Sequence, residues 1–182
     1  MQKATKMNNN NLKIKETLVS AIQNHKKNNF KVAEGLYKEI LKIKPNHFES
    51  VFYLGALLVQ TKNFDKAKQL LQKAIQIQPN FVATHNNLGI VFKELGEHQK
   101  AIICNEKAIK LKPDYVRAYS NMLLTSLHLE KVDAKYYLTK TKEFRLSLKP
   151  INKNLLLKYQ FDGSPKKLKI GFISGDFQQH PV

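Results

Sequence analysis

Three prolines, Pro45, Pro79 and Pro113, recur every 34 residues, and this spacing constrains the fold more than any other feature of the chain. A period of 34 residues is that of a helix–turn–helix unit repeated along a solenoid. Other positions keep the same step: Ala33, Ala67 and Ala101; Leu54, Leu88 and Met122; Gly55 and Gly89. We therefore expect stacked helix pairs, because one isolated pair cannot bury both of its faces.

The residue types at these positions explain the spacing. Gly55 and Gly89 fall inside the first helix of their repeats, where glycine costs about 1 kcal/mol relative to alanine. This cost is tolerated where a neighbouring helix must approach closely, which a small side chain allows. The prolines are expected to end each second helix, because the residue before a proline is biased away from helix.

These are tetratricopeptide-like repeats, and they divide the chain. We expect a disordered polar tail over residues 1–12 and a helical solenoid over residues 13–130. Three full repeats cover residues 14–47, 48–81 and 82–115, and a divergent fourth begins at residue 116. A capping helix is expected at residues 131–150, with Tyr137, Thr141, Phe144 and Leu148 on one face and Pro150 at its end. A connector over residues 151–167 follows.

The last segment, KLKIGFISGDFQQHPV, has a different character. The run from Ile170 to Ser174 is apolar, small and β-branched, and Gly175 and Asp176 come directly after it. Such a run is typical of the first strand of a parallel sheet followed by its loop. Residues 168–182 are therefore expected to start a second, α/β domain. The fold class is an all-α solenoid followed by the first strand of a truncated Rossmann-like domain.

Composition limits the partners of the chain. The formal charge of +17 suggests nucleic acid, but only Arg117 and Arg145 among 31 basic residues are arginine, and the lysines are spread along the chain. We expect no specific nucleic-acid binding. The longest apolar run, from Val51 to Val59, is too short for a membrane span, so no membrane partner is expected. The single Cys104 and the absence of an apolar leader favour a cytoplasmic location. The histidines show no metal-ligand spacing, so no metal or cofactor is expected.

Helical repeats followed by a strand and loop of the form LKIGFISGDFQQHPV resemble the SPINDLY-like protein O-linked N-acetylglucosamine transferases, especially their bacterial members. The residues that match the loop of that family are Ser174, Asp176, Phe177, His180 and Pro181. The resemblance implies that the repeats lead into a catalytic region of two Rossmann-like halves. It also implies sugar transfer from UDP-N-acetylglucosamine to serine or threonine hydroxyls of proteins in the complete protein.

The same resemblance implies two sets of site residues. His180 is the catalytic candidate, although His180 and Pro181 can also be read as an ordinary turn. Asn87 and Asn121, one repeat apart, resemble an asparagine ladder that binds an extended peptide in the concave groove, although an exposed helical asparagine needs no special role. The chain lacks the donor-binding half, so whether it is an enzyme stays open and we expect no activity from it alone. The alternative function is a non-catalytic scaffold that binds partner proteins.

Overall fold

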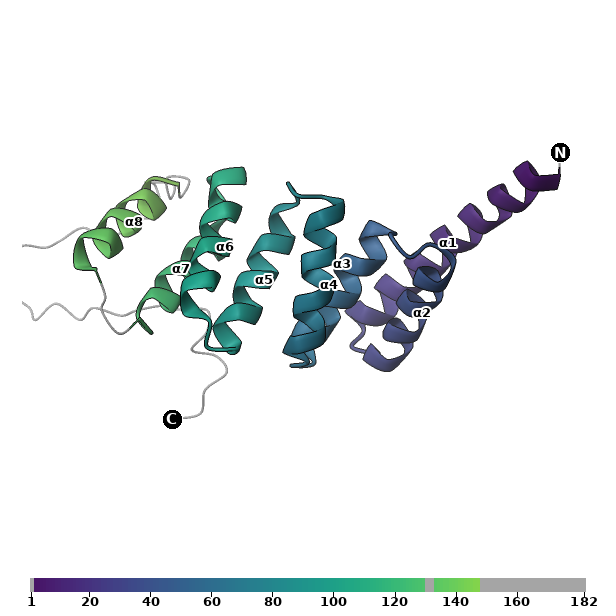
Figure 1. Ribbon diagram of the computed structural model, residues 1–182, viewed down its shortest axis with the longest axis horizontal. Coiled ribbons are helices and arrows are strands. Elements are labelled where there is room, and N and C mark those ends of the chain that lie inside the picture. The colour runs from purple at the N-terminus through teal and green to yellow at the C-terminus, as the bar shows by residue number, and fades with distance from the viewer. Residues whose placement is uncertain (1, 130–132, 148–182) are drawn as a thin grey trace, which may run out of the picture. The chain divides into compact units, whose positions relative to one another are not determined.

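The computed structural model describes residues 2–129 and 133–147, and these residues form eight α-helices and no strand (Figure 1). The helices are α1 (Gln2–Lys26), α2 (Phe30–Ile43), α3 (Phe48–Gln60), α4 (Phe64–Ile77), α5 (Val82–Glu94), α6 (His98–Leu111), α7 (Val116–Ser126) and α8 (Ala134–Ser147). The predicted helical solenoid is confirmed for this part of the chain. The connector at residues 151–167 and the strand expected within residues 168–182 lie outside the described residues.

The helices keep the period of the prolines. The first helices of successive repeats, α3, α5 and α7, begin 34 residues apart at Phe48, Val82 and Val116. The second helices, α2, α4 and α6, each end two residues before Pro45, Pro79 or Pro113. A proline disfavours helical backbone in the residue before it, so each second helix stops at the same point of its repeat.

The turn inside each of the first three helix pairs also repeats. One residue in each turn has a left-handed backbone: Asn28 (φ 61°), Lys62 (φ 59°) and Gly96 (φ 74°). The backbone N–H of the residue after it donates a hydrogen bond to the carbonyl oxygen five residues earlier. Asn63 N–H, for example, donates to the Leu58 carbonyl oxygen at 2.8 Å. Glycine adopts this conformation freely and asparagine readily, whereas the Cβ of a lysine is crowded by it. Lys62 is therefore a strained position in an otherwise favourable pattern.

The helices form two layers. Each of α1, α3 and α5 contacts the next odd-numbered helix, whereas the backbones of α2, α4 and α6 do not contact one another. The first helices of the repeats thus form one layer whose members contact one another, and α2, α4 and α6 form a second layer. We call α1, α3, α5 and α7 the inner layer, and α2, α4 and α6 the outer layer.

The core between the two layers uses the predicted repeat positions. Ala33, Ala67 and Ala101 are fully buried, and Leu54, Leu88, Met122, Gly55 and Gly89 are buried as well. The buried residues form two clusters, the first extending from Ala21 to Ala101 and the second built around Ile102, Tyr119, Met122 and Leu123. The second cluster joins the last full repeat to α7 and α8.

The helix α8 packs against α7 through part of the expected face. Tyr136, Tyr137 and Phe144 pack on the second cluster, and the rings of Phe144 and Tyr119 stack at 5.2 Å. Thr141 is exposed and does not join this contact. Tyr136, which was not expected on this face, does, and its hydroxyl donates a hydrogen bond to Glu106 Oε1 at 2.6 Å. Leu148 and Pro150 lie outside the described residues.

The N-terminal segment also differs from expectation. α1 begins at Gln2, whereas residues 1–12 were expected to be a disordered tail. The segment contains no glycine or proline, and alanine, lysine, glutamine and methionine favour helix, so nothing in it breaks the helix. Burial nevertheless starts where the first repeat was predicted to start: Leu12 is 57% exposed and Ile14 is 7% exposed.

Candidate peptide-binding groove

The two asparagines predicted to bind a peptide both lie on the inner layer. Asn87 belongs to α5 and Asn121 to α7, and both side chains are half-buried. The helices α5 and α7 contact each other directly, so the two residues lie on adjacent helices of one surface. Ile90 and Leu124 follow them by three residues on the same helix face, and Leu124 is 57% exposed. This surface therefore offers amide and apolar groups together.

The structure adds a third asparagine to this surface. Asn121 Nδ2 donates to Asn86 Oδ1 at 3.0 Å, and Asn86 is only 3% exposed. This bond occupies one donor of Asn121 and leaves its side-chain oxygen available, while the Asn87 side chain makes no hydrogen bond to the described residues. Asn86 was missed because the same repeat position holds Phe52 in the preceding repeat and Ser120 in the next. Only the contact between α5 and α7 reveals its role.

Toward the N-terminus the inner layer becomes aromatic. In the two preceding repeats, the position equivalent to Asn87 and Asn121 is occupied by Tyr53 and Val19. Tyr53 stacks on the buried Tyr37 with ring centroids 6.1 Å apart, whereas Val19 is 51% exposed. The inner layer thus has an amide-rich part on α5 and α7 and an aromatic part on α1 and α3.

The aromatic part is hollowed. A depression of about 450 Å³ lies between α1 and α3. It is lined by Ile22, His25, Lys26, Asn28, Phe52, Tyr53, Ala56 and Gln60. Half of these residues are aliphatic or aromatic, and the exposed polar side chains of Lys26, Asn28 and Gln60 form its rim. This combination is typical of pockets that bind one large side chain or a small ligand.

A hydrogen-bonded chain runs from the core to this rim. His25 Nε2 lies 3.1 Å from Gln60 Oε1, and His25 Nδ1 lies 3.3 Å from the Tyr37 hydroxyl. An amide oxygen can only accept, so the neutral His25 donates from Nε2 and its Nδ1 accepts from Tyr37. Burial, with a smaller contribution from Tyr53, raises the pKa of Tyr37 well above its usual range, which keeps this hydroxyl protonated. The Gln60 NH2 group remains free to donate to a ligand.

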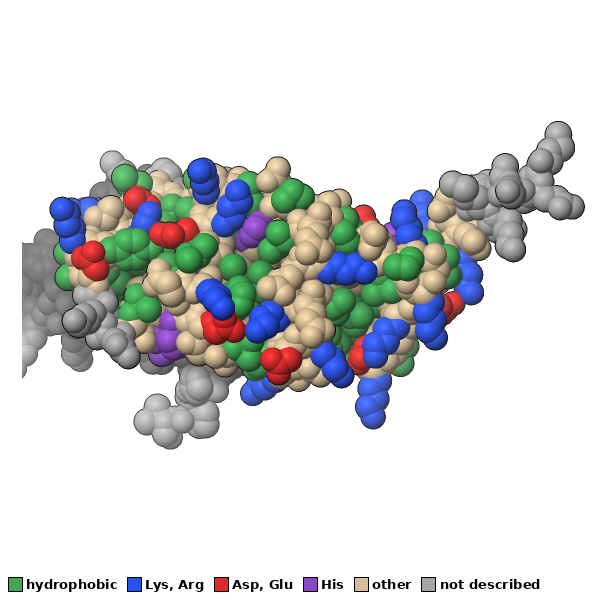
Figure 2. Space-filling view, viewed as in Figure 1, with side chains coloured by type: hydrophobic (Ala, Val, Ile, Leu, Met, Phe, Trp, Pro, Cys, Tyr) green, Lys and Arg blue, Asp and Glu red, His purple; other side chains and the backbone are tan. Residues whose placement is uncertain are grey.

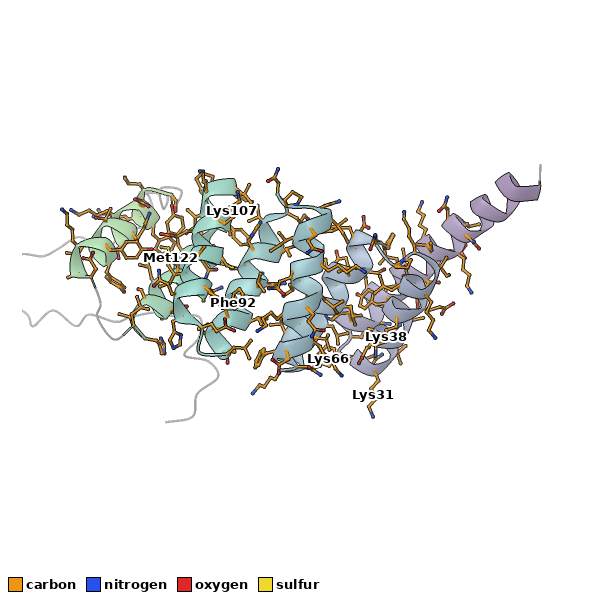
Figure 3. The ribbon with its side chains drawn as sticks, in the orientation of Figure 1. Lys31, Lys38, Lys66, Phe92, Lys107 and Met122 are labelled. Atoms are coloured by element: carbon orange, nitrogen blue, oxygen red, sulfur yellow. The ribbon has the colours of Figure 1, made fainter. Side chains whose placement is uncertain are left out.

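The basic residues of the chain do not form one binding stripe. Lys31 and Lys38 project from α2, Lys66 from α4 and Lys107 from α6 (Figure 3). On the face shown in Figure 2, basic side chains are interspersed with acidic, apolar and uncharged ones. Several are paired: hydrogen bonds from Lys100 and from Lys68, the latter at 3.3 Å, lower the pKa of the Glu97 carboxyl. This arrangement fits a solvated outer surface.

The groups that could carry other chemistry are not assembled into a site in the described part. Burial raises the pKa of the Cys104 thiol to about 11, so this cysteine is a poor nucleophile. No cluster of three or more histidine, cysteine or carboxylate side chains suits a metal ion within residues 2–129 and 133–147. None of the helices described is both long enough and apolar enough to span a bilayer. His180 lies outside the described residues.

Two sequence profiles of the tetratricopeptide repeat match the chain, one over residues 25–83 and the other over residues 82–115. No curated protein sequence matches it significantly. Among solved structures, a mutant of the Thermobaculum terrenum O-GlcNAc transferase superposes with a TM-score of 0.70 at 25% identity. That match covers 75% of this chain but only 26% of the transferase chain.

Two further structures are similar in fold. MamA superposes with a TM-score of 0.69 at 23% identity over 87% of both chains. The first TPR of Spaghetti (RPAP3), bound to the HSP90 peptide SRMEEVD, superposes with a TM-score of 0.63 at 15% identity over 66% of this chain and 95% of that one. The chain belongs to the tetratricopeptide-repeat family, and its protein-interaction repeats resemble the N-terminal part of a bacterial O-GlcNAc transferase.

Proposed function

We propose that the inner layer binds an extended polypeptide, and that these repeats are the substrate-engaging N-terminal part of a protein O-GlcNAc transferase-like enzyme. The observation that supports peptide binding most strongly is the group of amides on α5 and α7. Asn121 is oriented by its bond to Asn86, and its oxygen and the Asn87 amide remain available. One amide can both donate to a peptide carbonyl and accept from a peptide N–H, so this surface can pair with backbone of any sequence.

The enzymatic part of the proposal rests on the transferase likeness together with the loop around His180. Glycosyl transfer needs a bound donor, an oriented hydroxyl and preorganised groups that stabilise the departing diphosphate. The repeats would contribute by holding the acceptor polypeptide, whereas UDP-N-acetylglucosamine would bind only in the complete protein. His180 is the proposed catalytic residue there.

Peptide binding is tested by titrating labelled acceptor peptides against the parent and the Asn87→Ala/Asn121→Ala variant at fixed salt. Each neutral hydrogen bond lost should cost about 1 kcal/mol, so the double variant should bind roughly tenfold or more weakly. The exposed Lys66→Ala change on the outer layer is the matched control and should leave affinity unchanged. Equal affinities of parent and double variant would contradict the asparagine ladder.

Catalysis is tested on a chain extended through the full glycosyltransferase region. Residues 1–182 alone should show no sugar transfer from UDP-N-acetylglucosamine, whereas the extended chain should show transfer that His180→Ala strongly reduces. Turnover by the short chain would contradict the first expectation. Full activity of the extended His180→Ala protein would leave His180 as an ordinary turn residue.

The second candidate function is a non-catalytic scaffold, which the tetratricopeptide repeats support equally well. A scaffold would use the same groove to hold a partner protein, so the peptide titration does not separate the two proposals. Intact-mass measurement of the natural polypeptide does, because a transferase must continue past Val182 into its catalytic region. A natural chain that ends at Val182 would favour the scaffold.

A further inference from the structure

We propose that the aromatic hollow between α1 and α3 is a specificity pocket that takes a large apolar side chain, preferably aromatic, followed directly by an acidic residue of the bound peptide. This inference rests on the proposed peptide-binding function and adds to it a choice of sequence. The amides of α5 and α7 would bind backbone without reading side chains. The hollow is chemically different, because its walls can read a side chain.

The apolar half of the preference follows from the walls. Phe52 and Tyr53 contribute ring surfaces, and Ile22 and Ala56 contribute aliphatic surface. The Phe52 and Tyr53 rings meet edge to face at 5.3 Å, and Phe52 also meets Phe81 at 4.9 Å, so the wall is held in place by a ring cluster. An aromatic ligand side chain can extend such a cluster in the same geometry.

The acidic half follows from the rim. When histidine is counted as neutral, Lys26 is the only charged residue among the eight that line the hollow. None of the eight is an aspartate or a glutamate. Lys26 is exposed and forms no ion pair within the described residues. The Gln60 NH2 group, oriented through His25 by Tyr37, is a second donor that lines the same hollow. These two donors, in a hollow whose lining contains no carboxylate, favour an acceptor-rich group, and a ligand carboxylate can accept from both.

The test uses three fluorescein-labelled glycine–serine decapeptides that carry Phe-Asp, Ala-Asp or Phe-Lys at their centre, measured by anisotropy with residues 1–182. We expect the Phe-Asp peptide to bind about tenfold or more tightly than Ala-Asp, because a filled apolar pocket discriminates at least this much. It should bind roughly two- to fivefold more tightly than Phe-Lys, as is typical of an exposed ion pair. The charge-swap variant Lys26→Glu should reverse the order of Phe-Asp and Phe-Lys.

Two further variants separate the parts of the pocket. Ala56→Trp should fill the hollow and remove the preference for Phe-Asp over Ala-Asp, and Tyr37→Phe should weaken only the preference for the acid. If Ala56→Trp or Tyr37→Phe fails to fold, Lys26→Glu still tests the pocket, because it changes only an exposed side chain. Lys66→Glu on the outer layer is the matched control and should change none of the preferences.

The outcomes distinguish this inference from the proposed function. Equal affinities of the parent for all three peptides, or an unchanged order in Lys26→Glu, would overturn the specificity pocket and leave backbone binding by the asparagines intact. No binding of any of the three peptides would overturn both. In the Asn87→Ala/Asn121→Ala variant all three affinities should fall by the same factor, because the amides read only backbone.

Discussion

Replacing Gly89 by leucine tests the close approach of α5 and α6 on which the third repeat depends. A Cβ at Gly89 would lie 2.8 Å from Nδ2 and 2.9 Å from Oδ1 of Asn105. Asn105 is fully buried, and its Nδ2 donates to the Ala101 carbonyl at 3.0 Å, so it cannot move aside without breaking that bond. Overpacking a core site typically costs about 1–3 kcal/mol. Leucine extends well beyond Cβ, so we expect the upper end of that range.

Gly35 provides the matched control. It lies within α2, is exposed, and has nothing within 4 Å of a Cβ built on it. Gly35→Leu should therefore gain only helix propensity, about 1 kcal/mol, which raises the Tm of a chain of this size by about 2–4 °C. Gly89→Leu makes the same propensity gain but should lose about 2 kcal/mol net, which lowers the Tm by roughly 4–8 °C.

Thermal unfolding followed by circular dichroism measures both changes. Asn105→Ala removes the atoms that leucine would meet, so the loss caused by Gly89→Leu should shrink in that background. A Gly89→Leu protein with an unchanged or raised Tm would refute close helix approach at this position. The same loss with and without Asn105 would show that Asn105 is not what limits the space.

The remaining predictions concern single positions. Lys62→Gly should raise the Tm, because the left-handed backbone at Lys62 costs a side-chain-bearing residue about 1 kcal/mol; a lower Tm would contradict strain there. His47 caps α3 because its Nδ1 accepts a hydrogen bond from the Ser50 N–H. Burial lowers the pKa of the His47 imidazole; the charge of Lys44 lowers it further, and the charge of Glu49 acts in the opposite direction. The unfolded chain therefore takes up the proton first, so stability should fall as the pH drops below about 6.5, and His47→Asn should weaken this dependence; identical pH profiles would count against it. Cys104 should react slowly with a thiol reagent at neutral pH in the folded protein and rapidly after unfolding, because burial raises its thiol pKa to about 11; equal rates would show that it is accessible.

The periodic part of the fold was predictable from the sequence because it repeats. Each proline determines where a second helix ends, and each small residue at position 55, 67, 89 or 101 marks a close crossing, so the helix pairs follow from spacing alone. Residues 1–12 were expected to be a tail, whereas α1 begins at Gln2, because four consecutive asparagines disfavour a helix only weakly and no residue in this segment breaks one.

The groove was less predictable because its contacts cross between repeats. The positions of Asn87 and Asn121 on the inner layer follow from the period, but the bond from Asn121 to Asn86 depends on how α5 and α7 pack. The bond from His25 to Gln60 likewise joins residues 35 positions apart on different helices. The sequence did not predict that Tyr136 of α8, rather than Thr141, packs on the second cluster. The helix α8 has no equivalent helix in another repeat with which its sequence can be aligned.

Site-specific photo-crosslinking tests most directly whether the inner layer binds peptide. A photoreactive residue is placed at Ile90 or Leu124 on the inner layer and at Lys66 or Lys107 on the outer layer, and each protein is irradiated with the labelled Phe-Asp decapeptide. The account predicts that label becomes attached at positions 90 and 124 and not at positions 66 and 107. Equal labelling of the two layers, or labelling of the outer layer alone, would contradict it.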